Sequence, residues 1–175
     1  MPVNRWVPWA TGAVFAVLYS LLSIRRFERF TVTSWDLAIF EQAAKAYSRF
    51  EAPIVTVKGP GYHLLGDHFS PIDMLLGPIY RVFPHAQTLL IVQALLIGGS
   101  IAIITSLAGR HLGQWWGLVL GILYGLSFGL QSAVIVDFHE VAFAVPLLAM
   151  AGSAFVDGRF DRVIWWSLPL LLVKE

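Results

Sequence analysis

Long apolar runs separated by short polar segments dominate the sequence. Residues 6–24, 88–107, 115–136 and 141–156 contain no charged side chain, and a fifth apolar run begins at residue 163. A helix needs about 20 mostly apolar residues to cross the hydrocarbon core of a bilayer. The pattern therefore predicts an all-α integral membrane protein with four to five transmembrane helices in a single membrane domain.

The fifth apolar run covers only residues 163–173 before Lys174 and Glu175 end the sequence. A helix rises about 1.5 Å per residue, so a run of this length cannot cross about 30 Å of hydrocarbon. We expect residues 163–175 to be an incomplete span and the chain to be the N-terminal fragment of a longer protein.

Residues 25–87 form the longest stretch between apolar runs. Residues 36–50 carry apolar side chains at helical spacing, which predicts an amphipathic helix lying on the bilayer surface. A loop containing Gly and Pro follows, with a short strand expected at residues 54–57. Ser70 and the proline after it predict the start of a second short helix.

The positive charges of the short loops suggest an orientation. Arg110, Arg159 and Arg162 lie in two of these loops, whereas residues 137–140 contain no Lys or Arg. The positive-inside rule places the first two loops in the cytoplasm and the third outside. The N-terminus is then expected in the cytoplasm, and residues 25–87 outside.

Composition supports the membrane class and narrows the chemistry. Hydrophobic residues make up 57% of the chain and charged residues 13%, with a mean hydropathy of +0.70. Soluble domains carry about a quarter charged residues. The net charge of +1 without a basic run gives no reason to expect a nucleic-acid partner. The chain has no cysteine, which excludes disulfides, thiolate catalysis and Cys-ligated metals.

Asp36 is the first candidate functional residue. It begins the expected surface helix directly after the first apolar run. An acid at this position is favoured by the helix dipole. It can also serve as a general base, or hold a substrate, at the membrane surface.

The other candidate residues fall on the same expected side of the membrane. His63, Asp67 and His68 can form hydrogen bonds, contact a substrate or bind a metal. Residues 137–140 hold three ionisable groups, more than a turn needs, and polar groups at membrane depth are usually functional. The expected substrate-binding residues are His63, Asp67, His68, Asp137, His139, Glu140, Lys174 and Glu175.

Gly117, Gly121, Gly125 and Gly129 recur at four-residue spacing in the third apolar run. Small residues at this spacing let a second helix approach closely in a membrane. The stripe is therefore interpreted as a helix-packing surface without chemistry.

Five motifs occur in an order that resembles a known family. They are residues 35–42 (WDLAIFEQ), 66–71 (GDHFSP), 78–81 (PIYR), 137–140 (DFHE) and 174–175 (KE). In this order they resemble the bacterial integral membrane family named domain of unknown function 2079. That family is similar to the C-type glycosyltransferases, which take sugars from polyprenyl-phosphate carriers at the extracytoplasmic side of the plasma membrane.

The resemblance implies a role for several residues. Asp36 would be the catalytic acid or base that activates an acceptor hydroxyl. His68, Asp137 and His139 would line the pocket for the lipid phosphate or the sugar. The implied partners are a membrane lipid and a polyprenyl-phosphate-linked sugar.

Two alternatives stay open from the residues alone. The first is a non-catalytic transporter or lipid-binding subunit, although charge-free spans favour a surface site over a translocation path. The second is a metal site formed by His63, His68, Asp137 and His139. We expect no cofactor, and a divalent metal would be required only in this second alternative.

Overall fold

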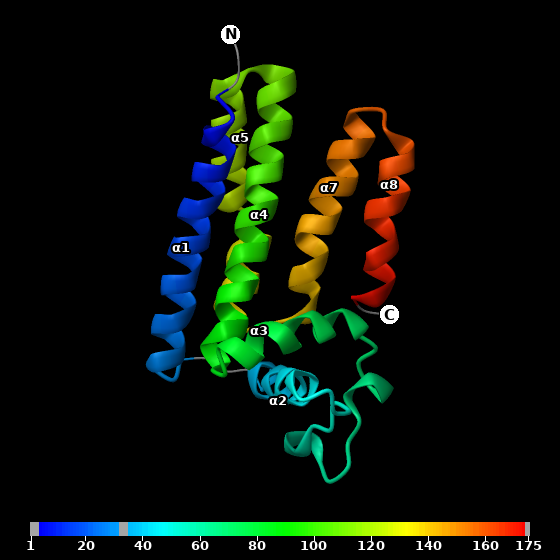
Figure 1. Ribbon diagram of the computed structural model, residues 1–175. Coiled ribbons are helices and arrows are strands. Elements are labelled where there is room, and N and C mark those ends of the chain that lie inside the picture. The colour runs from blue at the N-terminus through cyan, green and yellow to red at the C-terminus, as the bar shows by residue number, and fades with distance from the viewer. Residues whose placement is uncertain (1–3, 32–34, 174–175) are drawn as a thin grey trace.

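The computed structural model describes residues 4–31 and 35–173, and these fold as an all-α protein (Figure 1). Their α-helices are α1 (Trp6–Glu28), α2 (Asp36–Ser48), α3 (Leu76–Val82), α4 (Ala86–Leu112), α5 (Gln114–Gly125), α6 (Phe128–Val136), α7 (Ala144–Val156) and α8 (Phe160–Ser167). Short 3-10 helices accompany them: η1 (Thr56–Lys58), η2 (Leu64–Gly66), η3 (Pro71–Leu75), η4 (Glu140–Phe143) and η5 (Leu168–Leu172). The expected all-α class is confirmed.

Figure 1 shows α1, α4 and α5 side by side, with α7 and α8 as a second pair beside α4. Glycines allow the close approach of α1 to α4, since a Cβ atom at Gly12 would lie 2.4 Å from the carbonyl oxygen of Gly98. Ile97 and Ile101 of α4 are fully buried in this packing. Apolar packing and small residues therefore build the bundle, as in membrane helix pairs.

By length and composition, α1 and α4 are candidate membrane spans, and α5 and α6 make a third if they count as one. The other apolar stretch, Glu140–Val156, is shorter. The described helices thus support two to three spans by this measure, fewer than the four to five expected from the sequence.

The expected single helix over residues 115–136 is wrong, because α5 and α6 are separate and bent by 43°. Ser127 has extended backbone (ψ 144°) and ends the regular helix. The carbonyls released at the break are satisfied by side chains: the Tyr19 hydroxyl donates to Gly125 O, and Gln131 Nε2 donates to Leu126 O at 2.7 Å. Such replacement partners permit a break within an apolar segment.

The glycine stripe is partly confirmed as a packing surface. A Cβ atom at Gly117 would lie 2.7 Å from the backbone of Gly109, and one at Gly121 would lie 1.9 Å from Thr105 Oγ1. Gly125 meets the ring of Phe15, whereas a Cβ atom at Gly129 meets nothing within 4 Å. The interpretation holds for three glycines and fails for Gly129, which lies beyond the bend.

The segment between α1 and α4 lies across one end of the bundle (Figure 1). Helix α2 confirms the predicted amphipathic helix, and η3 followed by α3 confirms the predicted second one. The expected strand at residues 54–57 is wrong: Ile54 makes only an isolated bridge to His63, and Thr56–Lys58 is a 3-10 turn. A shared core of buried side chains, including Phe40, joins this segment to α4 and to Phe138.

Candidate functional site

Residues 137–140 form the floor of a polar cluster at the end of the bundle beside α2. Helix α6 ends at Val136, and the chain runs extended through Asp137 before η4 begins at Glu140. Phe138 is fully buried, and its ring packs edge-on against Phe40 of α2 with centroids 5.5 Å apart. This contact joins two motifs that lie about a hundred residues apart in the sequence.

Asp137 connects the start of α2 to the helix bundle through a hydrogen bond. Its carboxylate accepts hydrogen bonds from the backbone N–H of Leu37 at 3.1 Å and of Phe138 at 2.8 Å. The Leu37 N–H belongs to the first turn of α2, where backbone donors lack helical partners, so Asp137 caps α2 from across the fold. Asp137 is 2% exposed. Burial raises the pKa of its carboxyl group, and the two hydrogen bonds oppose this effect.

Gln93 of α4 supports the same segment and was missed from the sequence. Its side-chain Nε2 donates to the carbonyls of Asp137 at 2.9 Å and Ala133 at 3.1 Å, and its Oε1 accepts from the His139 N–H at 3.0 Å. The available signal was a polar amide within a charge-free apolar run.

Asp36 and His139 face each other above this floor. His139 Nε2 lies 3.5 Å from Asp36 Oδ2, and each side chain is 35% exposed. Asp36 comes from the first residue of α2, and His139 from the turn before η4. Two of the predicted site residues are thus brought together at the surface of the cluster.

Two further acids lie buried nearby: Glu140 and Asp73 are 2% and 1% exposed, respectively. Asp73 Oδ2 accepts a hydrogen bond from the Ser70 hydroxyl at 2.7 Å. The pKa of Asp73 is raised to about 7, chiefly by burial; the Ser70 hydrogen bond opposes the rise and the charge of Glu140 adds to it. No site role is predicted for Asp73 from the sequence, since a Ser-Pro-x-Asp pattern is typical of any helix start.

An open groove of about 260 Å³ adjoins Asp137. It lies among the end of α1, the first turns of α2 and the start of α4. Its lining is mostly apolar, with two carboxyl groups: Phe27, Phe30, Leu37, Ala38, Glu41, Ala86 and Asp137.

The loop residues predicted beside this site make a separate cluster. Asp67 forms an ion pair with Lys58, and His68 Nε2 lies 3.2 Å from the same carboxylate. The Lys58 hydrogen bond lowers the pKa of Asp67. His63 contributes its backbone to the bridge with Ile54. The ion pairs of Asp67 with Lys58 and His68 lie within this loop.

The metal alternative is not supported. Residues 4–31 and 35–173 contain no group of three or more His, Asp or Glu side chains that could hold a metal ion. The described residues do not gather His63, His68, Asp137 and His139 into such a group, and a metal site stays an untested prediction. Lys174 and Glu175 lie outside the described residues, and their predicted role stays a prediction.

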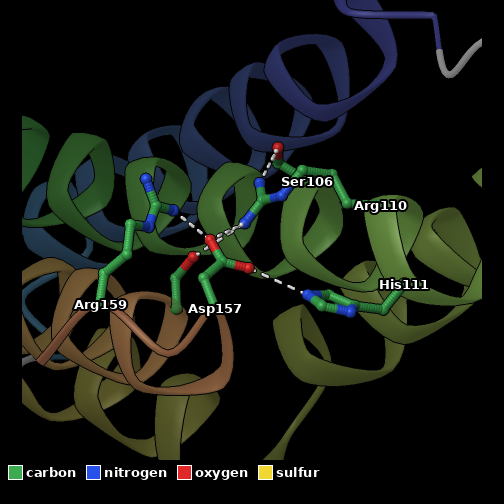
Figure 2. A network of polar contacts seen from close by, with 6 residues as sticks. Ser106, Arg110, His111, Asp157 and Arg159 are labelled. Atoms are coloured by element: carbon green, nitrogen blue, oxygen red, sulfur yellow. Dashed lines mark hydrogen bonds and ion pairs between the residues drawn. The ribbon is translucent and has the colours of Figure 1, made fainter.

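A second polar network lies at the opposite end of the bundle (Figure 2). Asp157, after α7, accepts from Arg110 Nη2 at 3.0 Å, lies 3.0 Å from His111 Nε2 and pairs with Arg159. Arg110 also donates to the hydroxyls of Ser106 at 3.0 Å and Ser153 at 3.1 Å. The His111 and Arg159 contacts lower the pKa of Asp157 to about 2. This network joins α4 to the α7–α8 loop. From the sequence, Arg110 and Arg159 are interpreted only as a signal for the orientation of the chain in the membrane.

Comparison with known proteins identifies the family. No curated protein and no solved structure matches the chain. A family model described as "Predicted membrane protein (DUF2079)" matches residues 26–175, which include α2, η3 and the cluster around Asp36 and His139. That match covers most of the chain and agrees with its apolar helices, so the chain belongs to the DUF2079 family of predicted membrane proteins.

Proposed function

We propose that the protein is a glycosyltransferase-like membrane enzyme that takes a sugar from a polyprenyl-phosphate donor at the extracytoplasmic face of the plasma membrane. The observation that carries the proposal is the pairing of Asp36 with His139, 3.5 Å apart and partly exposed above a buried polar floor. A carboxylate beside an imidazole is suited to proton transfer from a hydroxyl group.

In the proposed reaction, Asp36 removes the proton of an acceptor hydroxyl as its oxygen attacks the anomeric carbon of the sugar. The bond from that carbon to the phosphate oxygen breaks, and polyprenyl phosphate leaves with the bonding electrons. His139 orients the Asp36 carboxylate and contacts the donor phosphate when protonated. The roles proposed for His63, Asp67 and His68 reduce to contacts with the distal part of a substrate, because these side chains lie in the separate loop cluster.

The apolar groove beside Asp137 supports a lipid-linked donor. Aromatic and aliphatic side chains from three helices line it next to a carboxylate. An isoprenyl chain fits such a lining, while its phosphate stays at the polar end. In this proposal all five apolar segments lie in the bilayer, with residues 25–87 outside.

Release of polyprenyl phosphate tests the function. The purified protein in lipid nanodiscs is given a panel of synthetic polyprenyl-phosphate hexoses with water or sugar acceptors. We expect release with at least one donor. Asp36→Asn should lower the rate about 10²–10⁴-fold, the usual contribution of a general base.

The matched control is Asp161→Asn, because Asp161 is an exposed acid in α8. It should release polyprenyl phosphate at the wild-type rate, and both variants should insert into membranes equally. Wild-type release by Asp36→Asn would remove Asp36 from the mechanism. Donor binding without release by the wild type would favour the lipid-binding alternative.

A further inference from the structure

A groove between α2 and α3 gathers three cations away from the Asp36 cluster. Lys45 and Arg49 lie one helical turn apart at the end of α2, and Arg81 lies in the last turn of α3. All three line one open groove of about 630 Å³. None takes part in an ion pair within the part of the chain that the structure describes. Cations held together without a carboxylate partner favour an anionic ligand.

The nearest acid on the same helix, Glu41, contacts a residue of the groove, Tyr80. Glu41 lies one turn before Lys45, and its Oε1 accepts a hydrogen bond from the buried Tyr80 hydroxyl at 2.9 Å. Three cations and no acid line the groove itself, so its net charge is positive even with Glu41 beside it.

The backbone after α2 holds an aromatic ring at the groove. Phe50 has φ +60°, in the left-handed region that favours glycine, and the Glu51 N–H returns to Ala46 O at 3.0 Å. This is the usual C-terminal turn of a helix, with Phe where Gly is common. Its ring is 89% exposed, and the Arg81 guanidinium lies 5.8 Å from the ring centroid. A costly conformation that exposes an apolar ring points to a function for that ring.

The groove lies next to the start of α4, a candidate membrane span. Pro84 lines it, and α4, a candidate span, begins two residues later at Ala86. Val82 and Phe83 beside it are 68% and 61% exposed. Cations next to exposed apolar side chains are typical of proteins that bind at the headgroup level of a membrane.

We propose that this groove binds the phosphate of an anionic phospholipid, with Lys45, Arg49 and Arg81 around the phosphate and Phe50 against the glycerol and upper acyl chain. Arginine suits this role because its planar group donates two hydrogen bonds to phosphate oxygens. Binding here anchors α2 at the bilayer surface and is independent of sugar transfer at Asp36.

Lipid-dependent stabilisation tests the proposal without an activity assay. The purified protein in neutral detergent is titrated with dioctanoyl phosphatidylglycerol, dioctanoyl phosphatidylcholine or inorganic phosphate, and the rise in Tm gives an apparent Kd. We expect phosphatidylglycerol alone to raise Tm. Arg49→Gln combined with Arg81→Gln should weaken its binding at least about tenfold, since charge-assisted hydrogen bonds are lost.

Two further variants keep the test decisive. Arg49→Lys with Arg81→Lys retains both charges and should keep the preference for phosphatidylglycerol, even if the Gln variant folds poorly. Arg162→Gln removes an exposed arginine at the other end of the bundle and should bind like the wild type. Equal shifts with both lipids, an equal effect of inorganic phosphate, or an unchanged Kd in the Gln variant would overturn the proposal.

Discussion

At the residue scale, the buried acids have different partners and therefore different roles. Asp137 accepts two backbone hydrogen bonds and fixes the start of α2, so it acts on Asp36 through position. Asp73 is buried, with one hydroxyl donor and a nearby acid in Glu140, so its pKa is raised to about 7 and its neutral form is favoured below that pH. Asp36 and His139 combine partial exposure with direct contact beside these buried acids, which is why the proposed chemistry rests on them.

The raised pKa of Asp73 predicts a pH-dependent stability. Its pKa rises from 3.8 in the unfolded chain to about 7 in the fold, so unfolding releases a proton between these values. From this group, stability should be highest below about pH 4 and fall as pH rises from 4 to 7, by roughly 1.4 kcal/mol for each pH unit. Tm measured in detergent should fall less over this range in Asp73→Asn than in the wild type.

Asp161→Asn, which changes an exposed acid, is the control and should follow the wild-type profile. If Asp73→Asn also loses stability with the wild-type slope, Asp73 is ionised in the folded protein over this pH range, which contradicts the prediction.

Helix contacts explain what the sequence could and could not predict at the element scale. The apolar spacing of α2 and the Ser70-Pro71 start before α3 are local signals, and both elements were predicted from them. The bend between α5 and α6 depends on Tyr19, 106 residues away, so no local pattern indicates it. The same holds for the Asp36–His139 contact: the sequence placed both residues on one side, but only packing of Phe138 on Phe40 brings them together.

The glycine stripe gives a test of the α4–α5 contact. In Gly117→Ala, the new Cβ atom would lie 2.7 Å from the backbone of Gly109, which cannot move as a flexible side chain does. We expect a loss of about 1–3 kcal/mol of stability, typical of overpacking. Gly129→Ala adds a methyl group in open space and should be neutral or gain up to about 1 kcal/mol from helix propensity. Thermal unfolding of both variants checks this, and equal effects would contradict the packing.

The Asp157 network gives a second test, of the link from α4 to the α7–α8 loop (Figure 2). Asp157→Asn removes the negative charge and one of the two acceptor oxygens shared by Arg110, His111 and Arg159, and we expect a lower Tm near pH 7. Because the pKa of Asp157 is lowered to about 2, its contribution is present above about pH 4 and is lost only as pH falls toward 2. A wild-type Tm in the variant at pH 7 would show that the network contributes little.

The whole molecule has two chemically different ends. One carries α2, α3 and the acids around Asp36, and the other carries the arginines around Asp157. The bundle between them is apolar, with two to three candidate spans. The proposed reaction needs such an arrangement, because it requires a polar site at one end of an apolar bundle.

Accessibility of single cysteines in intact cells tests this account most directly, because the chain has no cysteine of its own. Cysteines replace Trp35 (71% exposed), Phe69 (43% exposed) and His139 (35% exposed), with Arg162 at the opposite end as the control. A membrane-impermeant maleimide should label the first three in intact cells and the control only after lysis. Labelling of Trp35 outside while His139 reacts only after lysis would separate the two residues by the membrane and contradict a single site.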